Sequence, residues 1–139
     1  MILVDTSAFI AICDKAEGNN HRRCVEALYD FKQRNESLAT TIPCLTEAMY
    51  FLHKTFGWTG QEKLWRLLEK NAFEVHHPNI DERVRMHQLM SKYKDTPMDF
   101  ADASLVAAAE TLKTSNIFTL DSDFNIYRTI GKKSFEIIP

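Results

Sequence analysis

Cysteine, glycine and proline are all scarce in this sequence, and each shortage narrows what the chain can be. It has three cysteines, four glycines and four prolines among 139 residues. The cysteine count is odd and no CxxC spacing occurs, so we expect no disulfide framework or zinc knuckle, but buried thiols in a reducing compartment. No repeat, low-complexity segment or linker is visible. We therefore expect one domain over residues 1–139, long enough to bury a core without disulfides or a structural metal.

Long apolar runs and an excess of either charge are also missing. No stretch approaches the ~18 apolar residues of a transmembrane helix. Strand-like residues begin at Ile2 and leave no room for a signal peptide with a charged start, so we expect a cytoplasmic protein. The net charge of −2 and pI near 6.2 do not indicate nucleic-acid binding by the molecule as a whole. A local basic cluster, or metal ions held by carboxylates, could still reverse the charge at one site.

Short apolar segments alternate with segments of helical spacing. We expect strands at 2–4, 37–42, 72–77, 116–120 and 134–138. Helices are expected at 6–15, 21–34, 43–56, 59–70, 79–94 and 96–113, with a short one at 121–128. Because the strands are nearly continuous apolar runs, both faces of the sheet should be covered. The alternation predicts an α/β fold, a three-layer α/β/α sandwich with a central, largely parallel sheet.

Polar residues mark several expected helix starts. Asn20 is a candidate cap for the helix at 21–34, and Pro43 suits a first helical position. Thr59 with Glu62 has the spacing of a capping box. Asn79, followed by Glu82, marks the start of another helix.

Carboxylates follow two of the expected strands and open two of the expected helices. Asp5 ends the first strand and Asp121 ends the fourth. In open α/β sheets, sites form outside the carboxyl ends of strands, so these two acids could face one crevice. Glu47 and Asp102 lie near the starts of helices that we expect to begin at the same edge. Two further acids, Asp99 and Asp123, are within reach of it.

Converging carboxylates would repel one another and raise each other's pKa values. A hard divalent cation such as Mg²⁺ or Mn²⁺ removes that problem, since these ions prefer oxygen ligands. Ions held in this way commonly serve the hydrolysis of phosphodiesters. The chain has no GxxxxGK[ST] or GxGxxG motif and no convincing Ser-His-Asp order.

Each acid also has a purely structural interpretation. Asp5 could begin a turn after a strand, and Glu47 could be a surface acid. Asp99 and Asp102 could be the cap and a first-turn acid of a helix, favoured by its dipole. Asp121 and Asp123 could cap a short helix. The combination, more than any single position, points to a site.

Four stretches carry a resemblance to the PIN-domain nuclease family. They are ILVDTS at 2–7, TE at 46–47, MDFADASL at 98–105 and TLDSDF at 119–124. They span nearly the whole chain in the family's order, and the length fits as well. The family's fold is an α/β/α sandwich with a parallel sheet in which the first and fourth strands are neighbours, which would bring Asp5 and Asp121 together.

The resemblance implies a role for each matching residue. Asp5, Glu47, Asp102 and Asp121 would be the catalytic, metal-binding acids, Asp123 an accessory acid and Asp99 a further candidate. One hydroxyl among Thr6, Ser7 and Thr119 would orient an acid or a water. The implied activity is cleavage of single-stranded or looped RNA that depends on Mg²⁺ or Mn²⁺.

Many small members of this family resemble the VapC toxins of toxin–antitoxin pairs. Those are usually dimers held inactive by an antitoxin peptide that covers the acidic site, so the expected partners are RNA, an antitoxin and a second copy of the chain. An RNA-processing or quality-control nuclease, and a non-cleaving scaffold that binds RNA or a partner, remain alternatives. A phosphotransferase of the haloacid-dehalogenase type fits poorly, because it needs a second Asp where Ser7 stands.

Basic and aromatic residues could hold the nucleic acid. Each candidate for a phosphate contact, taken singly, fits a solvated helix face better. The candidates are Arg22 and Arg23 beside His21, then Arg83, Arg85, Lys92, Lys94, Lys132 and Lys133. Tyr50 could stack on an unpaired base or lie in a core or dimer surface.

Overall fold

The computed structural model describes all 139 residues and contains a five-stranded parallel sheet. Its strands are β1 (Ile2–Val4), β2 (Leu38–Thr41), β3 (Glu74–His76), β4 (Asn116–Phe118) and β5 (Glu136–Ile138). The order across the sheet is β3-β2-β1-β4-β5, and every neighbouring pair is parallel. The expected parallel sheet is therefore confirmed. The pairing of β1 with β4 brings the ends of these two strands side by side.

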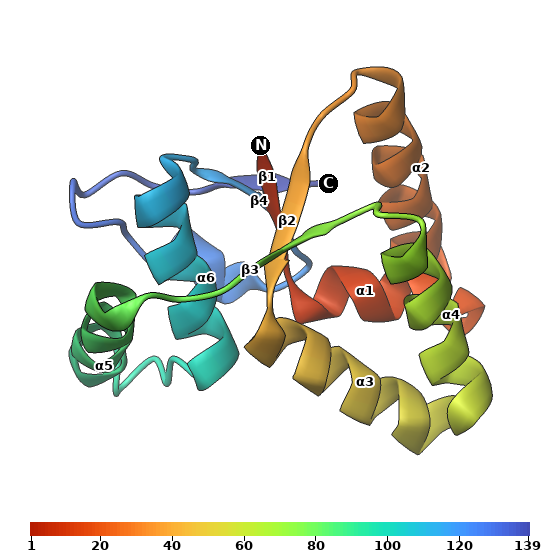
Figure 1. Cartoon of the computed structure of the whole chain (residues 1–139), viewed down its shortest axis with the longest axis horizontal. Coiled ribbons are helices and arrows are strands. Elements are labelled where there is room, and N and C mark those ends of the chain that lie inside the picture. Colours follow the sequence, from red (N-terminus) through yellow and green to blue (C-terminus); the bar gives the residue numbers. More distant parts are fainter.

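Helices cover both faces of the sheet and complete the expected three layers (Figure 1). On one side lie α1 (Thr6–Cys13), α2 (Asn19–Gln33), α3 (Ile42–Phe56) and α4 (Trp58–Glu69). On the other lie α5 (Ile80–Lys92) and α6 (Phe100–Leu112). Two short 3₁₀ helices, η1 (Lys15–Glu17) and η2 (Ser122–Asn125), complete the chain. No helix is both long enough and apolar enough to cross a membrane.

The central strand supplies side chains to two separate hydrophobic clusters. Leu3 joins the cluster under α5 and α6, whereas Ile2 and Val4 join the cluster under α1 to α4. This division follows from the alternation of side chains along a strand. Since both faces are covered, β1 is apolar throughout, and Asp5 is the first polar residue after it.

The expected helix start at Asn79 and Glu82 is confirmed, but two other expected starts are wrong. Asn79 and Glu82 exchange both hydrogen bonds of a capping box. Asn20 and Thr59 do not cap, because α2 and α4 begin earlier, after Gly18 and Gly57. Both glycines have a positive φ, which glycine tolerates best, and the turns that they make start each helix without a side-chain cap. The segment at 96–98 also lies outside α6, which begins at Phe100.

Gly60 lets α4 pack closely against α3, and a side chain there is expected to destabilise the protein. A Cβ at this position would lie 2.7 Å from the Leu52 carbonyl oxygen and 2.9 Å from Phe56 Cβ. We expect Gly60→Ala to lower the free energy of unfolding by about 1–3 kcal/mol in urea titrations. Gly131→Ala is the control, because a Cβ there meets nothing within 4 Å. Equal stability of the two variants would contradict this account.

Candidate active site

Asp5 lies directly after β1 and is held by its neighbours on β4. Its backbone N–H donates to the Phe118 carbonyl (3.0 Å), and its side chain is only 4% exposed. The Ser7 hydroxyl donates to Asp5 Oδ2 at 2.6 Å and the Thr119 hydroxyl at 2.7 Å. Burial raises the pKa of the carboxyl in spite of these hydrogen bonds, which act in the opposite direction. The same oxygen takes both hydroxyls, so Oδ1 is the oxygen available to a ligand.

Thr119 connects the ends of the two central strands. While its hydroxyl donates to Asp5, the same oxygen accepts from the Asp121 backbone N–H at 2.9 Å. Asp121 caps η2 through Oδ1, which accepts from the Asp123 N–H at 2.8 Å. The pairing of β1 with β4 thus places Asp5 and Asp121 at one edge, with Asp123 in the next turn.

Asp102 reaches the same region from the first turn of α6. Tyr127 is fully buried, and its hydroxyl donates to Asp102 Oδ2 at 2.9 Å. Burial raises the pKa of Asp102 to about 7, helped by the charges of Asp99, Asp5 and Asp121. Asp99 is the N-cap of α6, and its Oδ1 accepts from the Asp102 N–H at 2.8 Å.

Glu47 joins the group from α3, where it is half-buried. Its pKa is raised by burial first, and then by the charges of Asp99 and Asp5. The Thr6 hydroxyl does not bind Asp5: it donates to the Cys44 carbonyl at 3.3 Å, and its hydrogen bond with Glu47 lowers the pKa of that acid. Among the three hydroxyls considered from the sequence, Ser7 and Thr119 therefore hold Asp5, whereas Thr6 joins α1 to α3.

The four aspartates are hydrogen-bonded in the same way. In each of the four aspartates, the hydrogen bonds to the side chain end on one oxygen and leave the other for a ligand: Asp5, Asp99, Asp102 and Asp121. None of them, nor Glu47, forms an ion pair with a lysine or arginine. The arrangement therefore leaves several carboxylates within electrostatic reach of one another and no protein cation to offset them.

This donor set fits a hard divalent cation, for which carboxylate oxygens are suitable ligands. The side chains do not form a closed coordination sphere, because no three Asp, Glu, His or Cys residues are gathered closely enough to hold one ion. Mg²⁺ usually keeps several of its waters and takes one or two carboxylates directly. The open arrangement of the acids is compatible with an ion that keeps most of its water ligands.

A groove of about 660 Å³ adjoins the acids between α3 and α6. Glu47 and Asp99 lie on its wall beside three exposed aromatic side chains: Tyr50, Phe51 and Phe100. The sequence had allowed Tyr50 as a base-stacking or packing residue, and the structure places it in this groove. No lysine or arginine lines the groove.

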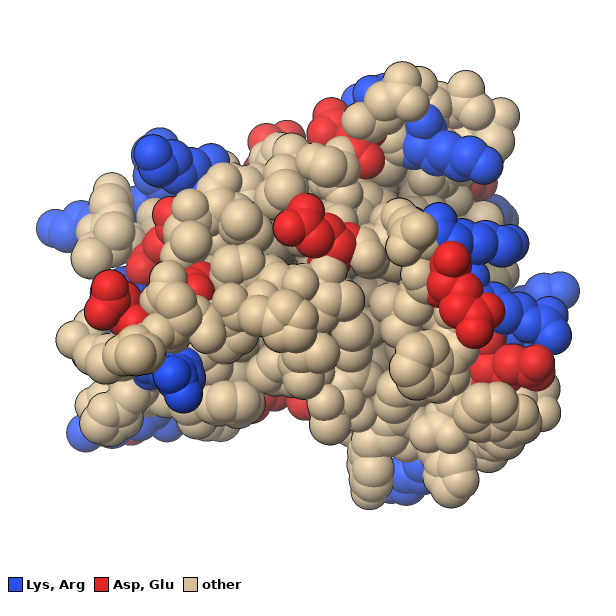
Figure 2. All heavy atoms as spheres, in the orientation of Figure 1, with Lys and Arg blue, Asp and Glu red and all other residues tan.

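Positive charge is dispersed over the face of the molecule that Figure 2 shows. Lysines and arginines lie there in separate groups near the rim, and they form no single basic patch. Arg85, a candidate phosphate contact, is already engaged: its Nε and Nη2 donate to Glu110 at 2.9 and 3.0 Å. Glu110 also accepts from the Ile130 N–H at 2.7 Å, so the pair joins α5, α6 and a loop.

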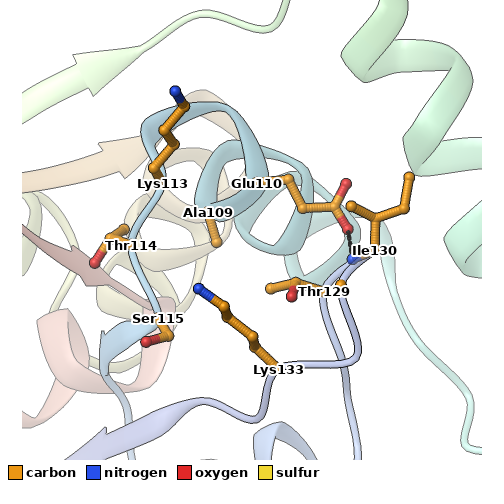
Figure 3. Close-up of a pocket in the computed structure, with 9 residues that line it drawn as sticks. Ala109, Glu110, Lys113, Thr114, Ser115, Thr129, Ile130 and Lys133 are labelled. Atoms are coloured by element: carbon orange, nitrogen blue, oxygen red, sulfur yellow. Dashed lines mark hydrogen bonds between the residues drawn. The ribbon is translucent and has the colours of Figure 1, made fainter.

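A second cavity, of about 280 Å³, lies beside Glu110 (Figure 3). It lies at the end of α6 and before β4, and Lys133 points into it while Lys113 points away. It shares no lining residue with the acids, so it is a separate feature of the opposite sheet edge.

Sequence reasoning missed Tyr127 and Phe100 as neighbours of the site. Tyr127 follows η2 in a loop, and its contact with Asp102 joins residues 25 apart. No local pattern marks such a residue. Phe100 did have a local signal. It stands between the N-cap Asp99 and the first-turn acid Asp102, so it lies in the first turn of α6 beside two acids of the site.

Comparisons with known proteins agree with this fold. The PIN domain model matches residues 2–129. Ribonuclease VapC26 of Mycobacterium tuberculosis (strain ATCC 25618 / H37Rv) is 28% identical over 99% of this chain and 100% of its own. The crystal structure of M. tuberculosis VapC20, described as a Sarcin-Ricin loop cleaving toxin, superposes with a TM-score of 0.81 at 19% identity, covering both chains fully. VapBC2 from Rickettsia felis, bound to a DNA fragment from its promoter, gives a TM-score of 0.72 at 17% identity, again over both full chains. The sequence match over nearly the whole chain shows that this protein belongs to the PIN-domain family.

Proposed function

We propose that this protein is a metal-dependent endoribonuclease, a single PIN-like nuclease domain over residues 1–139 that hydrolyses RNA phosphodiester bonds in the cytoplasm. The observation that carries the proposal is the group of acids at the edge of β1 and β4. Each aspartate is anchored through one oxygen and leaves the other for a ligand, and no protein cation compensates the group. The name of the 28% identical relative, a ribonuclease, supports the same activity.

Asp5, Glu47, Asp102 and Asp121 would hold Mg²⁺ or Mn²⁺. When bound, such an ion supplies an activated water and stabilises charge on the phosphate oxygens. Before any ion binds, these carboxylates repel an RNA phosphate, so ion binding and substrate binding are coupled.

The surrounding residues prepare the acids for this role. Ser7 and Thr119 hold Asp5 in one orientation, and Tyr127 holds Asp102. In metal sites, such supporting hydrogen bonds orient the ligands. We assign Asp123 an accessory part, since its backbone supports Asp121, and we assign Asp99 the support of the Asp102 backbone and an additional negative charge.

We further propose that the protein is the toxin of a toxin–antitoxin pair, with a homodimer as its own assembly. Two facts support this: the similarity to VapC26 along the full chain, and the groove beside Glu47 and Asp99. Its exposed Tyr50 and Phe100 form an apolar surface that a protein partner can cover. Such a partner would close access to the acids.

The decisive experiment is RNA cleavage by the purified protein, freed of any partner, in Mg²⁺, Mn²⁺ or EDTA. We expect discrete fragments from a pool of structured RNAs with either metal and none in EDTA, with cutting restored when Mg²⁺ is returned in excess. Cutting that persists in EDTA would contradict metal dependence. A folded protein that binds metal and cuts no RNA, either in the pool or when RNA ends are sequenced after its expression in cells, would contradict the proposed endoribonuclease activity.

A further inference from the structure

A small cavity of about 240 Å³ opens beside Asp121, on the side of the sheet covered by α2. Its wall comes from four elements: the start of α2, the end of β4, η2 and the end of β5. Thr119 and Asp121 belong both to this cavity and to the group of acids. Whatever occupies the cavity therefore lies directly next to the proposed active site.

Arg23 is the one cationic residue in the lining of this cavity. It lies in the second turn of α2, and its Nη2 donates to the Pro139 carbonyl at 2.5 Å. This hydrogen bond fixes the guanidinium at the cavity while most of its N–H donors stay available. The acids themselves have no lysine or arginine partner, and Arg23 is the one cation that lines this cavity together with Asp121.

The neighbouring arginine serves a different purpose. Arg22 is exposed, and its Nη2 donates to Asn19 Oδ1 at 2.6 Å within the first turn of α2. It does not line this cavity. Both arginines are exposed, but only Arg23 lines this cavity, and this contact distinguishes two residues that are indistinguishable in the sequence.

The remaining polar groups of the lining suit a ribose and its phosphate. Asn20 offers an amide from α2, and Ser122 offers a hydroxyl from η2. Asn125 donates through Nδ2 to the Ser122 carbonyl at 3.0 Å, which leaves its amide oxygen as an acceptor. The lining thus combines one guanidinium and the Asp121 carboxylate with neutral donors and acceptors.

We propose that this cavity is a subsite for the nucleotide next to the cleaved bond, with Arg23 contacting its phosphate. The inference rests on the proposed ribonuclease function and adds a position for the substrate. A planar guanidinium binds a phosphate through two parallel hydrogen bonds, which a lysine cannot do. Contacts of this kind fix the register of a nucleic acid and carry no sequence information. Arg23 would thereby place the backbone against Asp121 without selecting the base.

The test compares Arg23→Gln with the matched control Arg22→Gln, using an RNA that the wild type cleaves in Mg²⁺. We expect Arg23→Gln to raise KM by about three- to tenfold with a smaller change in kcat, and Arg22→Gln to keep both within about twofold. The dependence of log(kcat/KM) on log[salt] should also become shallower in Arg23→Gln, by about 0.7 for one lost phosphate contact. Arg23→Lys keeps the charge and should recover part of the loss.

Each outcome separates the subsite from the function itself. Equal KM values for the two glutamine variants would overturn the subsite, as would a loss confined to kcat, while leaving the nuclease intact. A wild type that cleaves no RNA would overturn the proposed function and this inference with it. Thermal unfolding of each variant checks that a loss does not come from the broken contact with Pro139.

Discussion

Replacing Asp5 with asparagine is expected to reduce the rate of RNA cleavage by about a hundred- to a thousandfold. Asparagine has nearly the shape of aspartate, so it can keep the hydrogen bonds from Ser7 and Thr119 to one oxygen. The oxygen that faces a ligand is replaced by an amide NH₂, which is no ligand for Mg²⁺. Removal of one preorganised electrostatic group at a reacting centre commonly costs this much.

A graded series makes the result specific. Thr119→Val removes one hydroxyl that orients Asp5, and we expect a smaller loss of about 10–100-fold, the range seen when an outer-shell partner of a metal ligand is removed. Asp30→Asn, an exposed acid on α2, should cleave like the wild type. Cleavage rates at saturating Mg²⁺, with circular dichroism to verify folding, provide the measurement. A Thr119→Val variant that loses more than Asp5→Asn would contradict the assigned roles.

The positions of the acids could be predicted from the sequence, but the residues that hydrogen-bond to them could not all be. Asp5 and Asp121 follow strands whose ends meet at one edge by a general rule of parallel sheets. That these two strands are neighbours was implied by the resemblance to the PIN-domain family, and the pairing of β1 with β4 confirms it. The contact of Tyr127 with Asp102 depends on how a loop after η2 returns to α6. No periodicity marks a residue whose role is fixed by the packing of distant segments.

Helix starts also divide into those set by neighbouring residues, which were predicted, and those set by other features, which were not. The helix start at Asn79 and Glu82 was predicted, because both partners of the capping box that forms there lie within four residues. The starts of α2 and α4 depend on the turns made by Gly18 and Gly57. The polar residues Asn20 and Thr59, which lie two residues further on, suggested later starts. The groove beside Glu47 was not predictable either, since it exists only where α3 and α6 pack together.

The second large effect is a gain in stability, whereas the first is a loss of cleavage activity. Asp102→Asn should make the metal-free protein more stable at pH 8, by about 1–2 kcal/mol after allowance for solvent screening. Burial and the charges of Asp99, Asp5 and Asp121 raise the pKa of Asp102 to about 7, from 3.8 in the unfolded chain. The ionised form is therefore disfavoured in the folded state. Asparagine removes this cost and still offers Tyr127 an acceptor.

The pH dependence follows from the same two pKa values. Between pH 3.8 and about 7 the folded protein holds a proton on Asp102 that the unfolded chain has released. The free energy of unfolding therefore falls as pH rises through this window, and changes no further from this group above it. The variant lacks this dependence, so its advantage over the wild type should be small near pH 4 and full at pH 8.

Urea unfolding of both proteins at pH 4.5 and pH 8 in EDTA measures the effect, expressed as variant minus wild type so that other titrating groups cancel. Added Mg²⁺ should then stabilise the wild type more than Asp102→Asn, because a ligand that binds only the folded state stabilises it by an amount that grows with the logarithm of its affinity. A variant less stable than the wild type at pH 8 in EDTA would mean that ionised Asp102 is stabilised by its surroundings. In that case the acids would not be a group kept under mutual repulsion for a cation, and the strongest physical support for the proposed site would be lost.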